Sequence, residues 1–335
     1  MNEIYSHDLV IGVDAGGTRS RACLAAPDGT VLGRGTGGPG NALSVPRAEL
    51  TLHLAQAVAG AVPEALRDRV RAVYGGFAGA TAGLGPERGR GLALSCLRDA
   101  VAAHGITGAV VDVGGDIDVA LAAAPGAPAD GLVLIAGTGA IAARLTGRRR
   151  SRVVDGHGWL LGDEGSGYWL GAHAVRAALE ALDGRGPWTS LVTAVAAHHL
   201  PEAGEEAARS GGRTVPPDAA GRFALAEAIV AHAYARPPAQ LARLSTAVVA
   251  CAAAGDTVAL HLLDRAADLL AGTVAALRPE PGEPLVVTGG LLGPGGPLLD
   301  RVTDRLGRHR LRIFPVTDGA AGAAALAAQL PVGTD

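Results

Sequence analysis

Lysine is absent from this sequence, in which all 29 basic residues are arginine. The absence excludes a P-loop with its lysine, a Schiff-base mechanism and the phosphate-binding lysine of a protein kinase. The formal net charge is -3, so no strongly basic field indicates a nucleic-acid partner. The one basic cluster, Arg148 to Arg150 with Arg152, is interpreted as an exposed hairpin tip.

Cysteines and long apolar runs are also scarce. The three cysteines, Cys23, Cys96 and Cys251, lie far apart, with neither metal-ligand spacing nor a disulfide framework, which favours a reducing cytoplasm. No uncharged apolar run is long enough to span a membrane, and residues 1–7 do not have the pattern of a signal peptide. We therefore expect a cytoplasmic protein without a membrane partner.

Length and hydrophobic pattern predict an α/β protein with two lobes. The chain has 335 residues, 48% hydrophobic and 18% charged, which is more than one typical core requires. Short apolar runs and helical patterns alternate from residue 9 to residue 145. Helical patterns dominate residues 166–277, with a candidate mobile loop near 204–217, and a strand at 284–288 precedes the last helices.

Two Gly-Thr turns form an internal repeat. The predicted strand 9–13 ends in Asp14-Ala15-Gly16-Gly17-Thr18, and strand 132–136 ends in Gly137-Thr138-Gly139. Each turn is followed by a returning strand at the start of an α/β half. The repeat predicts two similar lobes that face each other across a cleft.

The two turns have the chemistry of phosphate sites. A hairpin tip without side chains lets backbone N–H groups approach an anion, and a Thr hydroxyl adds a donor. Asp14, at the end of the first strand, could hold Mg²⁺ through water. Either turn alone is weak evidence and would favour an ordinary tight turn, because the chain contains 50 glycines; the repeat in matching context favours the phosphate site.

Asp116 is the candidate general base. It follows the predicted strand 108–113 and begins a helix at the boundary of the two halves, where a carboxylate could accept a proton from an attacking hydroxyl. The alternative is a helix N-cap. Asp118 points elsewhere on the same helix and serves as an internal comparison, whereas Asp112 has no assigned role.

Two further glycine-rich stretches are candidates for ligand contacts. Gly289-Gly290 follows strand 284–288, so a flat ring and a ribose could lie on the backbone; the alternative is a plain strand-to-helix turn. Residues 156–169 contain five glycines, two of the three tryptophans and the adjacent acids Asp163 and Glu164. This stretch is either the floor of a pocket or a loop with an N-cap. Trp159 and Trp169 are interpreted as packing residues.

Taken together, these motifs resemble the sugar-kinase, Hsp70 and actin ATPase superfamily. Asp14 to Thr18 is similar to its first phosphate motif, Gly137-Thr138-Gly139 to its second, Val287-Thr288-Gly289-Gly290 to its adenosine motif, and residues 318–323 to its second connecting helix. Residues 156–167, with their Gly-Asp-Glu-Gly-Ser core, resemble the signature of the branch shared by N-acetylglucosamine kinases and BadF/BadG/BcrA/BcrD-type ATPases. The resemblance covers essentially the whole chain.

The resemblance implies a two-lobed ribonuclease H-like fold, as in actin and hexokinase, with the active site in the interlobe cleft. The N-terminal lobe would comprise residues 1–115 and 317–335, and the C-terminal lobe residues 116–316. The implied activity is ATP-dependent, Mg²⁺-dependent phosphorylation of the 6-hydroxyl of N-acetyl-D-glucosamine, by a homodimer.

The resemblance also implies roles for individual residues. Asp116 would be the general base and Asp14 the metal residue. The implied sugar contacts are Asn41, Gly79, Asp116, His157, Gly158, Asp163 and Glu164. The implied nucleotide contacts are Gly16, Gly17, Thr18, Arg19, Gly137, Thr138, Gly139, Gly289 and Gly290.

Departures from the family pattern keep other substrates open. Ala140 stands where relatives often carry Ser, and Ile141 where human-type enzymes carry Asn, so recognition of the acetamide is not assigned. The alternatives are a kinase for glucosamine, N-acetylmannosamine or N-acetylmuramic acid, an activator-type ATPase, or a sugar-binding regulator. The cysteine spacing disfavours the activator, and the lack of a DNA-binding segment disfavours the regulator.

Overall fold

A computed structural model describes residues 8–80, 85, 87–200 and 218–331. The N-terminal sheet has the strand order β3-β2-β1-β4-β5, in which β1, β2 and β3 are antiparallel and β4 and β5 run parallel to β1. Its strands are β1 (Leu9–Ala15), β2 (Ser20–Ala25), β3 (Val31–Gly37), β4 (Val70–Phe77) and β5 (Val110–Gly115).

The second sheet repeats this plan. Its order is β10-β9-β6-β7-β8, with an antiparallel β6-β7-β8 portion and with β9 and β10 parallel to β6. The strands are β6 (Gly131–Ala136), β7 (Ala140–Thr146), β8 (Arg149–Asp155), β9 (Pro284–Thr288) and β10 (Arg312–Pro315). Each sheet therefore begins with a hairpin whose tip is a Gly-Thr turn.

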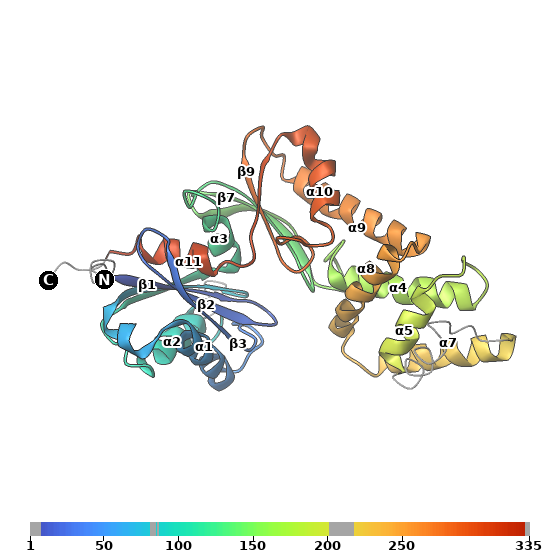
Figure 1. Ribbon diagram of the computed structural model, residues 1–335, viewed down its shortest axis with the longest axis horizontal. Coiled ribbons are helices and arrows are strands. Elements are labelled where there is room, and N and C mark those ends of the chain that lie inside the picture. The colour runs from blue at the N-terminus through green and yellow to red at the C-terminus, as the bar shows by residue number, and fades with distance from the viewer. Residues whose placement is uncertain (1–7, 81–84, 86, 201–217, 332–335) are drawn as a thin grey trace.

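Helices cover both faces of the N-terminal sheet (Figure 1). Because side chains alternate along a strand, Ile11 and Val13 of β1 face the core under α1 (Arg47–Ala61) and α2 (Gly89–Ala102). Val10 faces the other way, against α11 (Ala320–Ala327). The C-terminal helix thus returns to the lobe in which the chain begins.

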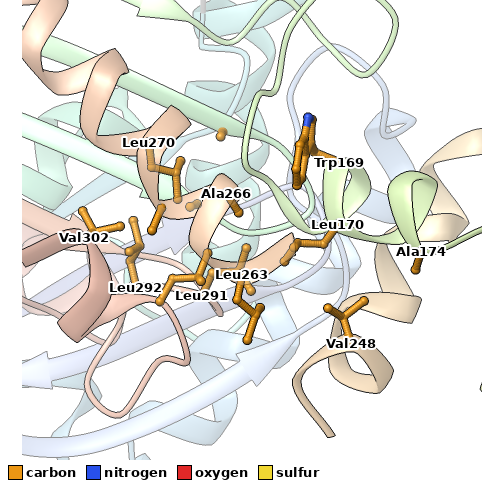
Figure 2. Close-up of a cluster of buried hydrophobic side chains, with 14 of the residues drawn as sticks. Trp169, Leu170, Ala174, Val248, Leu263, Ala266, Leu270, Leu291, Leu292 and Val302 are labelled. Atoms are coloured by element: carbon orange, nitrogen blue, oxygen red, sulfur yellow. The ribbon is translucent and has the colours of Figure 1, made fainter. Parts of the chain in front are cut away.

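The C-terminal lobe adds a group of helices beyond its sheet (Figure 1). Trp169 and Leu170 of α4 share a buried core with Val248 of α8, with Leu263 and Leu270 of α9, and with residues near β9 (Figure 2). The helices are α4 (Gly167–Leu182), α5 (Leu191–His199), α7 (Ala219–Tyr234), α8 (Ser245–Ala253), α9 (Thr257–Ala276) and α10 (Leu299–Leu306). Short 3₁₀ turns occur at Glu64–Arg69, Pro238–Leu244 and Gly307–His309.

The short helix α3 (Asp116–Ala122) joins the two lobes. One side of α3, with Val119, packs against α11, and the other, with Ile117, packs against the second sheet. Gly322 permits the close crossing of α3 and α11, because a Cβ there would overlap the Val119 carbonyl oxygen. Gly12 has the same role in β1, where a Cβ would overlap the Ala320 carbonyl oxygen.

The predicted two-lobed α/β class is confirmed, whereas the lobe boundaries at residues 115 and 316 stay a prediction. The strand predicted at 108–113 runs from Val110 to Gly115, so helix α3 begins directly at its end. The arginines assigned to a hairpin tip extend along β8, and only Arg148 lies in the turn. The candidate loop at 204–217 lies outside the described residues. Within the described part of the chain, no helix is long and apolar enough to span a membrane.

Gly322→Ala should lower the free energy of unfolding by about 1–3 kcal/mol, the usual cost of overpacking, because the Cβ meets backbone of α3. Gly272→Ala is the matched control: this exposed glycine of α9 has nothing within 4 Å of the added Cβ. The control should raise stability by about 0.5–1 kcal/mol through helix propensity. Equal shifts in the denaturation midpoints of the two variants would contradict the proposed crossing contact.

Candidate functional site

A cavity of about 900 Å³ lies between the two lobes and receives both Gly-Thr turns. Most of its lining comes from turns at the ends of strands, where backbone groups are free to meet a ligand. The lining residues are Asp14, Gly16, Gly17, Thr18, Arg21, Asn41, Asp116, Ala120, Ile135, Gly137, Thr138, Gly139, Ala140, Ile141, Gly156, Asp163, Ala239, Thr288, Gly289, Gly290, Gly293, Pro294, Gly295, Gly296, Thr317, Asp318 and Gly319.

The first Gly-Thr turn is closed by backbone hydrogen bonds. The Gly16 N–H donates to the Arg19 carbonyl (3.0 Å), and the Gly40 N–H donates to the Gly16 carbonyl (2.8 Å). Gly17 and Thr18 are exposed at the tip, and a Cβ on Gly17 would meet nothing within 4 Å. The tip therefore presents backbone and one hydroxyl to the cavity.

The second turn is tied to the start of α4. The Gly167 N–H donates to the Gly137 carbonyl (2.8 Å), and the Tyr168 N–H donates to the Thr138 carbonyl (3.0 Å). Ser166 caps the helix by accepting a hydrogen bond from the Trp169 N–H (3.1 Å). These contacts hold the second Gly-Thr turn and the helix together, because the carbonyl groups of the turn accept hydrogen bonds from the first N–H groups of α4.

Carboxylates gather where the first turn, α3 and α11 meet. Asp14 Oδ2 accepts a hydrogen bond from the Gly319 N–H (2.9 Å). Burial raises the pKa of Asp14 to about 6, and the nearby negative charges of Asp318 and Asp116 add to the increase. Arg21 lies opposite Asp14 in the β1–β2 register, with its Nε 3.8 Å from Asp318 Oδ2.

Asp116 is the first residue of α3. Its Oδ1 accepts a hydrogen bond from the Ile117 N–H (2.9 Å), and burial raises its pKa above the ordinary range. Asp118 has a different role, because its Oδ2 accepts from the Gly115 N–H (3.0 Å) and so caps the helix. Asp112, which had no assigned role, pairs with Arg90 (2.5 Å).

The acidic cluster fits a magnesium ion that is held mainly through water and phosphate. Within the described residues no group of three or more His, Cys, Asp or Glu side chains could hold a metal directly. Mg²⁺ prefers one or two carboxylates and keeps several waters, and the mutual repulsion of Asp14, Asp116 and Asp318 favours a cation there. Asp14 is the carboxylate beside the first turn.

Asp163 is held by a second aspartate, Asp155, at the end of β8. Asp155 Oδ1 accepts from the N–H groups of Gly156 (2.8 Å) and Asp163 (2.7 Å), and its Oδ2 accepts from the Glu164 N–H (2.8 Å). Asp155 and Asp163 both have positive φ, 63° and 58°, which is costly for residues other than glycine. One carboxylate thus clamps both ends of the loop 156–164.

Burial raises the pKa of the Asp163 carboxyl, and the charge of Asp155 adds to the increase. Asp163 Oδ1 accepts the Ala140 N–H (3.2 Å), which joins the loop to the second Gly-Thr turn. The remaining acceptor capacity of Asp163 faces the cleft, which it lines together with Gly156 and Asn41. A carboxylate and an amide on opposite lobes have the chemistry to bind the hydroxyls of a polar ligand.

Most of the predicted site residues line this one cavity: Asp14, Gly16, Gly17, Thr18, Asn41, Asp116, Gly137, Thr138, Gly139, Asp163, Gly289 and Gly290. Five do not. Arg19 is exposed behind the first turn, and Gly79 lies behind Asn41, where a Cβ would be 2.7 Å from Asn41 Oδ1. His157 and Gly158 lie in the loop beside Asp163, and Glu164 lines a different cavity.

Sequence reasoning missed Arg21, Asp155 and the site role of Asp318. The β1–β2 register could have indicated Arg21, because a seven-residue hairpin separation places it opposite Asp14. Asp318 had been assigned only to a connecting helix, yet it is 8% exposed and lines the cleft. Nothing in the sequence indicated Asp155, whose role depends on a loop that turns back on itself.

Comparison with known proteins gives the family. Residues 11–327 match the BadF/BadG/BcrA/BcrD ATPase family, and the chain belongs to it. A curated relative from Clostridium acetobutylicum, an N-acetylmuramic acid/N-acetylglucosamine kinase, is 32% identical over 185 residues. That alignment covers 54% of this chain and 57% of the relative, so the match spans little more than half of the curated protein.

Solved structures support the fold over nearly the whole chain. A candidate N-acetylglucosamine kinase from Chromobacterium violaceum is 27% identical, with a TM-score of 0.65, over 96% of this chain and 99% of that chain. A ROK family glucokinase from Streptomyces griseus, solved with glucose and AMPPNP, is 20% identical with a TM-score of 0.53, over 96% and 99%. The second likeness concerns the fold alone.

Asp155→Ala should loosen the loop 156–164, because it removes three hydrogen bonds to a charged acceptor. Such bonds contribute about 1.5–3 kcal/mol each, so amide exchange in the loop should accelerate at least about tenfold. Hydrogen-exchange mass spectrometry measures this directly. Asp183→Ala, at an exposed pair with Arg185 on the same lobe, is the control and should leave the loop unchanged. Unaltered exchange in both variants would show that Asp155 is not the clamp.

Proposed function

We propose that this protein is an ATP-dependent amino-sugar kinase that transfers a phosphoryl group to the 6-hydroxyl of N-acetyl-D-glucosamine. The observation that carries the proposal is the single cleft in which two Gly-Thr turns face Asp116 and Asp163. Membership of the BadF/BadG/BcrA/BcrD ATPase family supports ATP as the donor. The names of the Clostridium and Chromobacterium relatives support an amino sugar as the acceptor.

In this proposal the nucleotide lies between the two Gly-Thr turns. The Gly16 and Gly137 N–H groups close their own turns, so the backbone N–H groups of Gly17, Thr18, Thr138 and Gly139 are the ones that would bind the phosphates from opposite lobes. Gly289 has φ 96°, and a Cβ there would overlap the Ala136 carbonyl oxygen, so close packing against β6 requires this glycine. A Cβ on Gly290 would meet nothing within 4 Å, so Gly290 would offer bare backbone to the adenosine. Mg²⁺ near Asp14 would neutralise charge on the phosphates when bound.

Asp116 is the group that would accept the proton of the sugar hydroxyl. A base needs a pKa near the working pH, and burial moves the pKa of Asp116 upward from its ordinary acidic value, toward that range. The Ile117 N–H holds one carboxylate oxygen and leaves the other for the hydroxyl. The phosphoryl group then passes to the sugar oxygen in line, as general base catalysis in a kinase requires.

Asn41 and Asp163 would hold the sugar from opposite lobes of the cleft. Ala140 and Ile141 also line the cleft, and neither offers a polar side chain to an acetamide. N-acetylmuramic acid, which carries the same acetamide, is the second candidate acceptor because the Clostridium relative is named for it. Mg²⁺ dependence, the homodimer and the cytoplasmic location stay predictions.

Asp116→Asn should lower kcat by about 10²–10⁴-fold, the usual contribution of a general base, while the protein still binds sugar. Asp118→Asn is the matched control on the same helix, because its amide oxygen can still accept the Gly115 N–H. A coupled assay with N-acetylglucosamine gives kcat, and calorimetry gives the sugar affinity. Turnover of Asp116→Asn close to that of Asp118→Asn would disprove the assignment.

Asp163→Ala should mainly raise KM for the sugar, by about 10–100-fold, because hydrogen bonds to a charged acceptor contribute about 1.5–3 kcal/mol. The ATP dependence should change little. The assay is run across N-acetylglucosamine, N-acetylmuramic acid, N-acetylmannosamine and glucosamine, which also ranks the candidate substrates. An unchanged KM for every sugar would contradict a sugar role for Asp163.

A further inference from the structure

A second cavity, of about 770 Å³, lies on the C-terminal lobe and shares no residue with the cleft. Its walls are the loop after β8, one side of α4 and one side of α9. Its volume is in the range of small-molecule sites. The lining residues are Trp159, Leu160, Leu161, Gly162, Glu164, Tyr168, Trp169, Ala172, His173, Arg176, Arg265 and Leu269.

Two arginines of this cavity have no carboxylate partner within the described part of the chain. Arg265 lies on α9 close to Asp264 and Asp268, but those acids pair with Arg301 and Arg305 of α10. Arg176, on α4, forms no ion pair with a described carboxylate either. Guanidinium groups that have no carboxylate partner are the usual donors for a phosphate.

His173 orients one of these arginines. Its Nδ1 donates to the Trp169 carbonyl (2.8 Å), which leaves Nε2 as an acceptor 3.4 Å from Arg176 Nη1. Burial lowers the pKa of His173, which favours the neutral ring whose Nε2 can accept. The guanidinium of Arg176 is thus positioned rather than freely mobile.

The rest of the lining suits a sugar ring. Trp159 and Tyr168 lie with ring centroids 5.7 Å apart and ring planes tilted by 57°, and their aromatic surfaces form part of one wall. Trp169 is 8% exposed and stacks on His173 at 3.8 Å. Such surfaces pack against the apolar side of a ring, while the carboxylate of Glu164 can accept from hydroxyls. With two arginines, one glutamate and a neutral histidine, the cavity is net positive, which favours an anionic ligand.

We propose that this cavity binds a phosphorylated sugar and thereby controls the sugar site in the cleft. The loop 156–164 connects the two: Gly156 and Asp163 line the cleft, whereas Trp159 to Gly162 and Glu164 line the second cavity. A ligand that orders one face of this loop changes the affinity of the other face. The identity of the ligand as a product of the enzyme rests on the proposed function.

The test uses N-acetylglucosamine 6-phosphate as the probe, titrated into the full chain by calorimetry and by tryptophan fluorescence. Trp159 and Trp169 are two of only three tryptophans, so binding here should change the emission. Arg176→Gln and Arg265→Gln together should weaken binding at least about tenfold, since two charge-assisted contacts are lost. Arg98→Gln, an exposed arginine on the other lobe, is the control and should bind as the wild type does.

Further experiments distinguish probe binding in this cavity from probe binding in the cleft. Asn41→Ala, which alters the cleft but not the loop, should keep probe binding at the second cavity. Because the probe also competes with N-acetylglucosamine in the cleft, it should shift KM in both proteins, but clearly more in the wild type than in the double arginine variant. If the probe binds but the protein phosphorylates none of the sugars, the second binding site is supported and the proposed function is wrong.

Three outcomes would overturn the proposal. Loss of probe binding in Asn41→Ala with retention in the arginine variant would place the product in the cleft alone. Equal affinity for inorganic phosphate would show that the ring is not recognised. Leu160 and Leu161, 72% and 79% exposed at the rim, provide the third arm. If Leu160→Ser with Leu161→Ser converts a dimer to a monomer and the wild-type dimer does not bind the probe, a second copy covers this face instead.

Discussion

The contact between the C-terminal helix and the first strand decides where the acidic groups of the cleft lie. Gly12 and Gly322 remove two side chains, so α11 approaches the backbone of β1 and α3 closely. That approach brings the Gly319 N–H to Asp14 and places Asp318 beside it. Residues about 300 positions apart in the sequence therefore share one charged site, and a Cβ at either glycine would separate them.

In the second lobe, the conformation of the loop 156–164 depends on a single carboxylate, that of Asp155. Asp155 satisfies three backbone N–H groups of a loop in which two non-glycine residues have positive φ. For residues other than glycine, the left-handed backbone conformation costs free energy, and it persists only where surrounding contacts stabilise it. The bonds to Asp155 offset that cost and fix Asp163 against the second Gly-Thr turn.

The sequence was sufficient for the repeat and for most of the cleft, because both Gly-Thr turns follow strands whose apolar runs are unambiguous. It was insufficient where a role depends on tertiary placement. The local sequence indicates no more for Asp155 than a position at the end of a strand. Glu164 is predicted at the same site as its neighbour Asp163, although it lines another cavity. Arg21 and Asp318 pair across most of the chain's length, which no local pattern indicates.

The lack of lysine limits the positive charge that the protein can place in the cleft. Asp14, Asp116, Asp163 and Asp318 line it, and Arg21 is the only cation among its described lining residues. An unliganded cleft of this composition is electrostatically unfavourable: burial raises the pKa of Asp14, and the charges of Asp318 and Asp116 add to the increase. Polyphosphate alone would add more negative charge, whereas a polyphosphate carried with a divalent cation offsets the repulsion. In the proposed kinase, the acidic lining would therefore favour the metal-bound form of the nucleotide over the free one.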